Sequence, residues 1–339
     1  MSPAVDSQRP PQRENAFHSL RTAFATLSLV LQPPRPLSRN SHVAVLAISS
    51  PSELPRIEEA VQKLEQSGLK VTLAGNIAAT GNHSYLAGSD DDRVETFNRF
   101  LRSAEYDGYF FARGGYGAGR ILDRLDYDAI AANPRPIIGF SDLTALHQAI
   151  AVRCNVGTFH GPMVNLDFFN GLSPDIERWF WSMLGGEAPL QWGFDRKQVL
   201  QEGEAEGVLF GGCLSIITSL VGTPYDFWVD DGIWFFEDVE EPPYRIDRML
   251  THLRLSGRFR RVRGVVVGRL KDCGSETEID ALLREFFGSL AIPVVRDLPF
   301  GHYGDNLLLP IGAPVRLSTG ERAFTVTRPA VARNEASAG

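Results

Sequence analysis

Short apolar runs alternate with amphipathic helical segments along residues 43–160, and this alternation limits the fold more than any other feature of the sequence. Residues 43–49, VAVLAIS, form a near-continuous apolar run of the kind that is buried in a parallel sheet. A helical pattern that ends at Gly68 follows, and a second strand is predicted at residues 70–73. This alternation indicates a layered α/β domain whose functional site lies at the carboxyl ends of parallel strands.

The second half of the chain has a different pattern, in which short apolar strands predominate and helices are fewer. This mixture indicates a smaller, sheet-rich α+β domain. The predicted organisation comprises a disordered extension at residues 1–40, the α/β domain at 41–186, a linker at 187–206, the second domain at 207–330 and a disordered tail at 331–339.

The composition is that of an ordinary soluble globular protein, with 43% apolar and 22% charged residues. The net charge of −7 supplies no basic footprint for nucleic acid, and no run of about twenty apolar residues could span a membrane. The three cysteines have no close spacing, which indicates neither a disulfide framework nor a zinc knuckle. We therefore expect a cytoplasmic protein with a small-molecule or peptide partner.

Ser141 lies in the segment PIIGFSDLTALHQAI (residues 136–150), which predicts a buried strand, a tight turn and a helix. A serine in such a turn is held clear of the sheet at a helix N-terminus, which is a position for a nucleophile. The alternative is that Ser141 merely caps the helix, as Asp142 also could. Leu143 stands where a G-x-S-x-G elbow has its second glycine, so an ordinary hydrolase assignment does not follow.

A glycine-rich turn, RGGYGAGR (residues 113–120), follows the strand predicted at residues 108–112. It is not a G-x-G-x-x-G motif, because Arg120 occupies the last position, and it is not a Walker loop. A nucleotide site is therefore a weak prediction. Such a turn does present backbone NH groups, and that of Gly115 could reach an oxyanion formed over Ser141.

A nucleophilic serine needs a base and a group that orients the base. His302, in the polar turn PFGHYGDN, and His160, beside Gly161, are both candidates for the base. Glu237 and Asp238 follow a predicted strand and are the candidates for the orienting carboxylate. Spacing alone leaves both choices open.

Taken together, these segments resemble the L,D-carboxypeptidase family, also called murein tetrapeptide carboxypeptidases, which has the microcin C immunity peptidases as its other branch. The resemblance extends from about Val43 to about Val326. Its signatures appear in order as DDRVETFNRF, RGGYGAGRILDRLDYDAI, NPRPIIGFSDLTAL, HGPM, EGVLFGGCLS, FEDVEEPPYRIDRML and PFGHYGDNLLLPIGA.

The resemblance implies a Ser-His-Glu triad of Ser141, His302 and Glu237, with an oxyanion hole formed by the backbone NH groups of Gly115 and Asp142. It implies a flavodoxin-like N-terminal domain with a sheet-rich C-terminal domain, a homodimer, and chemistry without a metal or cofactor. The implied reaction removes the terminal D-alanine from murein tetrapeptides during peptidoglycan recycling.

An exopeptidase must also recognise the free terminal carboxylate of its substrate, and a bidentate arginine suits this task. Arg113 and Arg245 are the candidates. The short connection between GPM and EGVLFGG lacks the long substrate-covering loop of the immunity branch, which favours cell-wall recycling.

Two other functions compete with this one. An immunity-type peptidase would cleave peptidyl or aminoacyl nucleotides, and Trp228 or Trp192 could then stack on an adenine. A catalytically silent protein that binds cell-wall peptides is disfavoured because all three positions of the triad are chemically intact.

Overall fold

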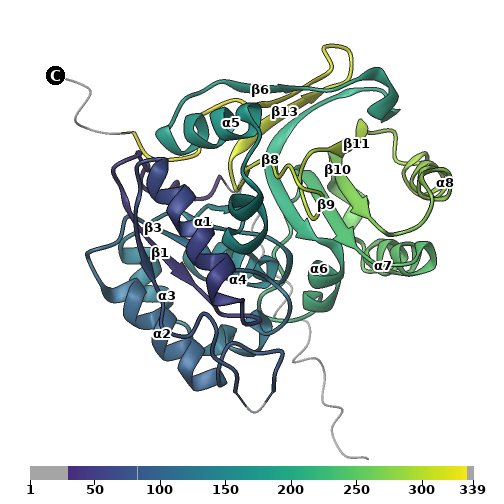
Figure 1. Cartoon of the computed structure of the whole chain (residues 1–339). Coiled ribbons are helices and arrows are strands. Elements are labelled where there is room, and N and C mark those ends of the chain that lie inside the picture. Colours follow the sequence, from purple (N-terminus) through teal and green to yellow (C-terminus); the bar gives the residue numbers. More distant parts are fainter. Residues whose placement is uncertain (1–29, 82, 334–339) are drawn as a thin grey trace, which may run out of the picture.

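The first half of the protein is built around a six-stranded sheet. The computed structural model describes residues 30–81 and 83–333 (Figure 1). The strands of this sheet are β1 (His42–Leu46), β2 (Lys70–Leu73), β3 (Gly108–Phe111), β4 (Ile137–Gly139), β5 (Thr158–His160) and β12 (Leu309–Ile311). Their order is β12-β5-β4-β3-β1-β2, and the five strands from the first half are parallel. The order 2-1-3-4-5 is that of a flavodoxin-like sheet, which confirms the predicted fold class.

Helices pack against this sheet (Figure 1), namely α1 (Leu54–Gln66), α2 (Asp90–Arg102), α3 (Tyr127–Ala132), α4 (Thr144–Cys154) and α5 (Pro174–Gly185). In α2, Ser89 and Asp92 form a capping box at the N-terminus, and the buried face carries Val94, Phe97 and Leu101. α4 is buried on nearly every side, so it forms part of the core that both halves share.

The second half of the protein is built around an eight-stranded sheet. Its strands are β6 (Leu190–Gly193), β7 (Val199–Gln201), β8 (Glu204–Cys213), β9 (Ile233–Val239), β10 (Gly264–Lys271), β11 (Val294–Leu298), β13 (Pro314–Ser318) and β14 (Ala323–Val326). The order is β6-β14-β13-β8-β9-β10-β11-β7, in which β8 to β11 are parallel and the outer pairings are antiparallel. The helices α6 (Leu214–Leu220), α7 (Pro243–Leu255) and α8 (Glu276–Phe287) accompany the parallel strands.

The strand β12 links the two halves. It comes from the end of the chain, yet it pairs antiparallel with β5 at the edge of the first sheet, with Leu309 opposite His160. The segment before β12 therefore runs from β11 in the second sheet to the edge of the first. This segment contains His302.

The predicted boundaries need correction at three places. Residues 30–40 are not a disordered extension, because Leu31 and Leu37 are each only 2% exposed and pack into the core. Residues 187–206 are not a plain linker, since β6 and β7 pair with β14 and β11. The predicted tail contributes Val331 to the core. The rest of the predicted extension and tail, residues 1–29 and 334–339, lies outside the described residues. No helix within the described ranges is long and apolar enough to span a membrane.

Candidate active site

Ser141 begins the 3₁₀ turn Ser141–Leu143 that joins β4 to α4. Its φ is +60°, a left-handed backbone conformation that residues other than glycine seldom adopt. The fully buried side chain of Phe140 anchors the preceding position, whereas Ser141 is only half-buried. A strained turn between a strand and a helix is the kind of place where a reactive serine is presented.

Asp142 does not cap α4, contrary to the expectation from its position in the sequence. In the part of the chain that the structure describes, no side chain caps either the turn or α4. Instead, Asp142 Oδ2 accepts hydrogen bonds from the Ser49 hydroxyl at 2.6 Å and the Ala118 NH at 2.8 Å. Burial raises the pKa of Asp142, and these two hydrogen bonds oppose the rise. The carboxyl group thus ties the Ser141 turn to the loop after β1 and to the glycine-rich turn.

The glycine-rich turn packs directly against Ser141. A Cβ atom on Gly114 would lie 2.8 Å from Ser141 Cβ and 2.9 Å from its Oγ. Gly115 has a φ of +100°, and a Cβ atom there would lie 2.2 Å from Ser50 Oγ. Both close approaches require glycine. The segments that carry Gly115 and Asp142 therefore both border Ser141.

His302 is held between Glu237 and the Ser141 turn. Its Nδ1 lies 2.7 Å from Oε2 of Glu237, which is fully buried in β9. Its ring packs edge-on against Phe140, with 4.8 Å between the ring centroids. Burial alone would lower the pKa of His302, but the negative charges of Glu237, Asp238 and Asp167 raise it above its ordinary value. The geometry thus brings the predicted base beside Glu237 and against Phe140, the residue that precedes Ser141.

His160, the alternative base, is unsuited to proton transfer. It is 0% exposed and lies among the rings of Phe140, Phe235 and Phe300. Neither ring nitrogen has a hydrogen-bond partner among the described residues. Burial lowers the pKa of His160 well below its ordinary value. His160 is therefore a core residue.

Asp238, the alternative orienting group, forms hydrogen bonds with backbone NH groups and not with His302. Its Oδ2 accepts a hydrogen bond from the Ser215 NH at 2.7 Å, and its Oδ1 accepts one from the Val239 NH at 2.9 Å. Burial raises the pKa of Asp238 to about 6. Glu237 is the member of this pair that contacts His302.

Two polar residues near His302, Asp167 and Asn306, carry no recognisable signal in the sequence. Asp167, fully buried in the π-helix Val164–Phe168, accepts a hydrogen bond from the Met163 NH at 2.7 Å, and burial raises its pKa to about 7. Asn306 is also fully buried, and its Oδ1 accepts a hydrogen bond from the Gly301 NH at 3.0 Å. No motif in the segment VNLDF marks Asp167, because its proximity to His302 depends on the crossing of β12.

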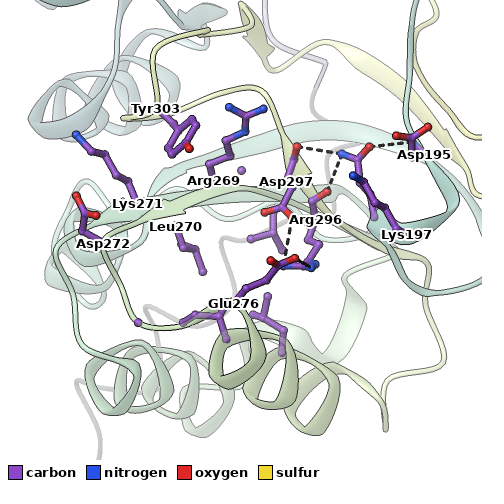
Figure 2. Close-up of a pocket in the computed structure, with 16 residues that line it drawn as sticks. Asp195, Lys197, Arg269, Leu270, Lys271, Asp272, Glu276, Arg296, Asp297 and Tyr303 are labelled. Carbon is purple, nitrogen blue, oxygen red and sulfur yellow. Dashed lines mark hydrogen bonds and ion pairs between the residues drawn. The ribbon is translucent and has the colours of Figure 1, made fainter.

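A pocket of about 680 Å³ lies beside the His302 loop (Figure 2). The Arg269 guanidinium stands over the ring of Tyr303, 4.5 Å from its centroid, and Tyr303 follows His302 in the chain. On the other side, Arg296 pairs with Glu276 at 2.7 Å and with Asp297 at 3.2 Å. The pocket is therefore lined by Tyr303, the residue after the candidate base, and several of its charges are already paired.

The two candidate arginines lie in different surroundings. Arg113 is exposed, follows β3 and lines another pocket, of about 450 Å³. Arg245 lies on α7 and pairs with Glu241 at 3.3 Å. The tryptophans considered for adenine binding pack within the protein, Trp228 against Trp234 and Phe210, and Trp192 against Trp179.

Comparisons with known proteins match both halves of the chain. Residues 43–161 match the model of the LD-carboxypeptidase N-terminal domain, and residues 206–317 match that of the C-terminal domain. The "Probable murein peptide carboxypeptidase" of Bacillus subtilis (strain 168) is 32% identical over 86% of this chain and 93% of its own. The "Murein tetrapeptide carboxypeptidase" of Pseudomonas aeruginosa is 30% identical over 80% of this chain and 92% of its own.

Among solved structures, the chain superimposes on MccF in complex with glutamyl sulfamoyl guanosine, with a TM-score of 0.81 at 24% identity. MccF is a microcin C7 self-immunity protein of Escherichia coli. The superposition covers 88% of this chain and 99% of the MccF chain.

The fold and the sequence relationships together define a serine-type peptidase of the hydrolase class. The chain belongs to the LD-carboxypeptidase family.

Proposed function

We propose that this protein is a serine L,D-carboxypeptidase that removes the terminal D-alanine from murein tetrapeptides. The observation that carries the proposal is the position of His302, which bonds to Glu237 and packs against Phe140, the residue before Ser141. Membership of the family and the names of the relatives in Bacillus subtilis and Pseudomonas aeruginosa support the substrate class.

In the proposed mechanism, His302 takes the proton of the Ser141 hydroxyl, and the alkoxide attacks the carbonyl before the terminal D-alanine. Buried Glu237 stabilises the imidazolium that forms, which agrees with the raised pKa of His302. The imidazolium then gives its proton to the departing amine. Water next attacks the acyl-enzyme, with His302 again acting as the base.

The oxyanion formed at each attack needs preorganised donors. We propose the backbone NH groups of Gly115 and Asp142, since both segments border Ser141. Each such donor contributes about 10² to 10³ in rate. The Asp142 side chain then has a separate task, because its bonds to Ser49 and Ala118 hold the two donor segments together.

The proposed setting is the cytoplasm, where the enzyme would act as a homodimer in peptidoglycan recycling. All three cysteines, Cys154, Cys213 and Cys273, are free thiols, as suits a reducing compartment. The homodimer rests on the family resemblance, and sedimentation of the purified protein measures it.

The decisive assay is release of D-alanine from a purified murein tetrapeptide by the wild type and by Ser141→Ala. We expect release by the wild type and a loss on the order of 10⁴ to 10⁶ in the variant. If neither protein releases D-alanine but the wild type cleaves an aminoacyl nucleotide, the function is instead of the immunity type.

A further inference from the structure

A pocket of about 450 Å³ lies where the strand order of the first sheet reverses. The chain passes from β1 to β2 on one side and then crosses to β3 on the other. In open α/β sheets, ligands bind at this topological switch point. We call this cavity, lined by Ser52, Glu53, Arg56, Thr80, Arg113 and Asn165 among others, the switch-point pocket.

Positive charge predominates among the ionisable groups of the switch-point pocket. Arg56 and Arg113 both line it, and neither forms an ion pair within residues 30–81 and 83–333. Arg56 is held in place, because its Nε donates to the Asn165 carbonyl at 2.8 Å and its guanidinium lies over the ring of Phe169. Glu53 is the one acidic side chain among the lining residues. A small anion would therefore meet two arginines whose charges are not neutralised by a carboxylate.

Ser52 provides an independent sign that this pocket binds a ligand. It is only 6% exposed, and its hydroxyl has no hydrogen-bond partner among the described residues. A buried hydroxyl without a partner is costly unless a ligand satisfies it. Oδ1 of Asn165, on the same wall, also lacks a partner, and the amide of this side chain can turn an NH₂ group towards an acceptor. α1 begins at this rim without a side-chain cap, so the positive end of its dipole adds to the attraction.

The switch-point pocket adjoins the segments that pack around the candidate nucleophile. Arg113 directly precedes Gly114, which packs against Ser141. Ser52 lies two residues after Ser50, which contacts Gly115. In a peptide with a free C-terminus, a single carbon separates the scissile nitrogen from the terminal carboxylate. A carboxylate subsite for such a substrate must therefore adjoin the nucleophile.

We propose that the switch-point pocket binds the terminal carboxylate of the substrate through the Arg113 guanidinium and the Ser52 hydroxyl. Arg56 and the N-terminus of α1 supply further positive potential. This inference rests on the proposed function and deepens it, because it identifies how the enzyme selects a free C-terminus. Arg245 is not needed for this role, since Glu241 already neutralises it.

The test compares a murein tetrapeptide that has a free carboxylate with the same peptide as its C-terminal amide. Arg113→Gln and Ser52→Ala should lower kcat/KM for the free acid by about 100-fold and about 10-fold, mainly through KM. Turnover of the amide should be unchanged in both variants. Arg113→Lys should recover part of the loss, and Arg245→Gln, whose arginine is paired with Glu241, should behave like the wild type. An unaltered ratio of acid to amide turnover in Arg113→Gln and Ser52→Ala would overturn the proposal.

A binding measurement separates this inference from the proposed function. Saturation-transfer NMR with D-alanine, and with D-alaninamide as the control, reports occupancy without turnover. We expect D-alanine to bind the wild type and Ser141→Ala, with loss of binding in Arg113→Gln. If the wild type cleaves neither peptide, the proposed function fails, but loss of D-alanine binding in Arg113→Gln still supports the carboxylate site. D-alanine binding that is equal in the wild type, Arg113→Gln and Ser52→Ala contradicts it.

Discussion

The imidazole of His302 lies 2.7 Å from the carboxylate of Glu237, although 65 residues separate the two in the chain. Glu237→Gln keeps the shape of the contact but removes the charge that stabilises the imidazolium. We expect kcat to fall by about 10⁴ with little change in KM. Steady-state kinetics of D-alanine release measure this. Asp238→Asn is the matched control, because Asp238 bonds to Ser215 and Val239, and its effect should be far smaller.

The pH dependence of kcat/KM should report the raised pKa of His302. A general base acts in its neutral form, so activity should fall as the pH drops through the pKa of His302, above its ordinary value of about 6.5. The carboxyl groups of Glu237, Asp238 and Asp167 raise the pKa of His302, whereas burial lowers it. The neighbouring His160 is neutral and adds no charge. Asp167→Asn should therefore move the acid limb to lower pH. An unmoved limb in this variant would show that Asp167 does not act on His302.

Asp167→Asn should also change how stability varies with pH. Burial raises the pKa of Asp167 from 3.8 to about 7, so the folded protein holds a proton that the unfolded chain releases. The contribution of Asp167 to the free energy of unfolding is fully present below about pH 4. It is lost as the pH rises towards 7, by up to about 4 kcal/mol. Urea unfolding at pH 5 and pH 8 should show a smaller loss in Asp167→Asn than in the wild type. Equal losses in the two proteins would contradict the assignment.

Gly114→Ala should damage catalysis more than folding. The added methyl group would lie 2.8 Å from Ser141 Cβ and would displace the nucleophile, at a cost of about 10² in kcat. Gly119→Ala is the control in the same turn, since its Cβ would meet nothing within 4 Å. Kinetics and thermal unfolding of both variants test this. Equal activity of the two variants would mean that the turn can shift away from Ser141.

His160→Leu should leave the enzyme active and less sensitive to acid. Neither nitrogen of His160 has a partner among the described residues, so an apolar side chain of similar size removes two unsatisfied groups. The pKa of His160 is lowered, which means that its contribution to stability is complete above about pH 6.5 and is lost below it. Thermal unfolding from pH 8 to pH 5 should therefore show a smaller decrease for the variant. Loss of activity in His160→Leu together with activity in His302→Ala would reverse the roles of the two histidines.

Local sequence patterns predicted the α/β architecture and the turn at Ser141 because both depend on residues that are close in the chain. The short apolar strands and the helix after Ser141 are of this kind. The resemblance to a family then selected His302 over His160, which spacing alone could not do. The contact of His302 with Glu237 now supports that selection on physical grounds.

Other features of the structure depend on contacts between distant segments, which local sequence patterns do not show. Asp142 could cap a helix by its position in the sequence, but its carboxylate bonds instead to Ser49 and Ala118, which belong to other loops. Residues 30–40 were predicted to be disordered from their composition, but Leu31 and Leu37 bury against the core. Asp167 has no local signal in the sequence, because only the pairing of β12 with β5 brings the His302 loop towards it.

The pairing of β12 with β5 has a consequence for synthesis of the protein on the ribosome. The strands β1 to β5 emerge early, but their sheet lacks its edge strand until residues 309–311 have been made. The segment that carries His302 is fixed against Phe140, the residue before Ser141, only when that strand is in place. A nascent chain therefore gains a complete active site only after β12 has been made, and a truncated product that stops before β12 is expected to be inactive.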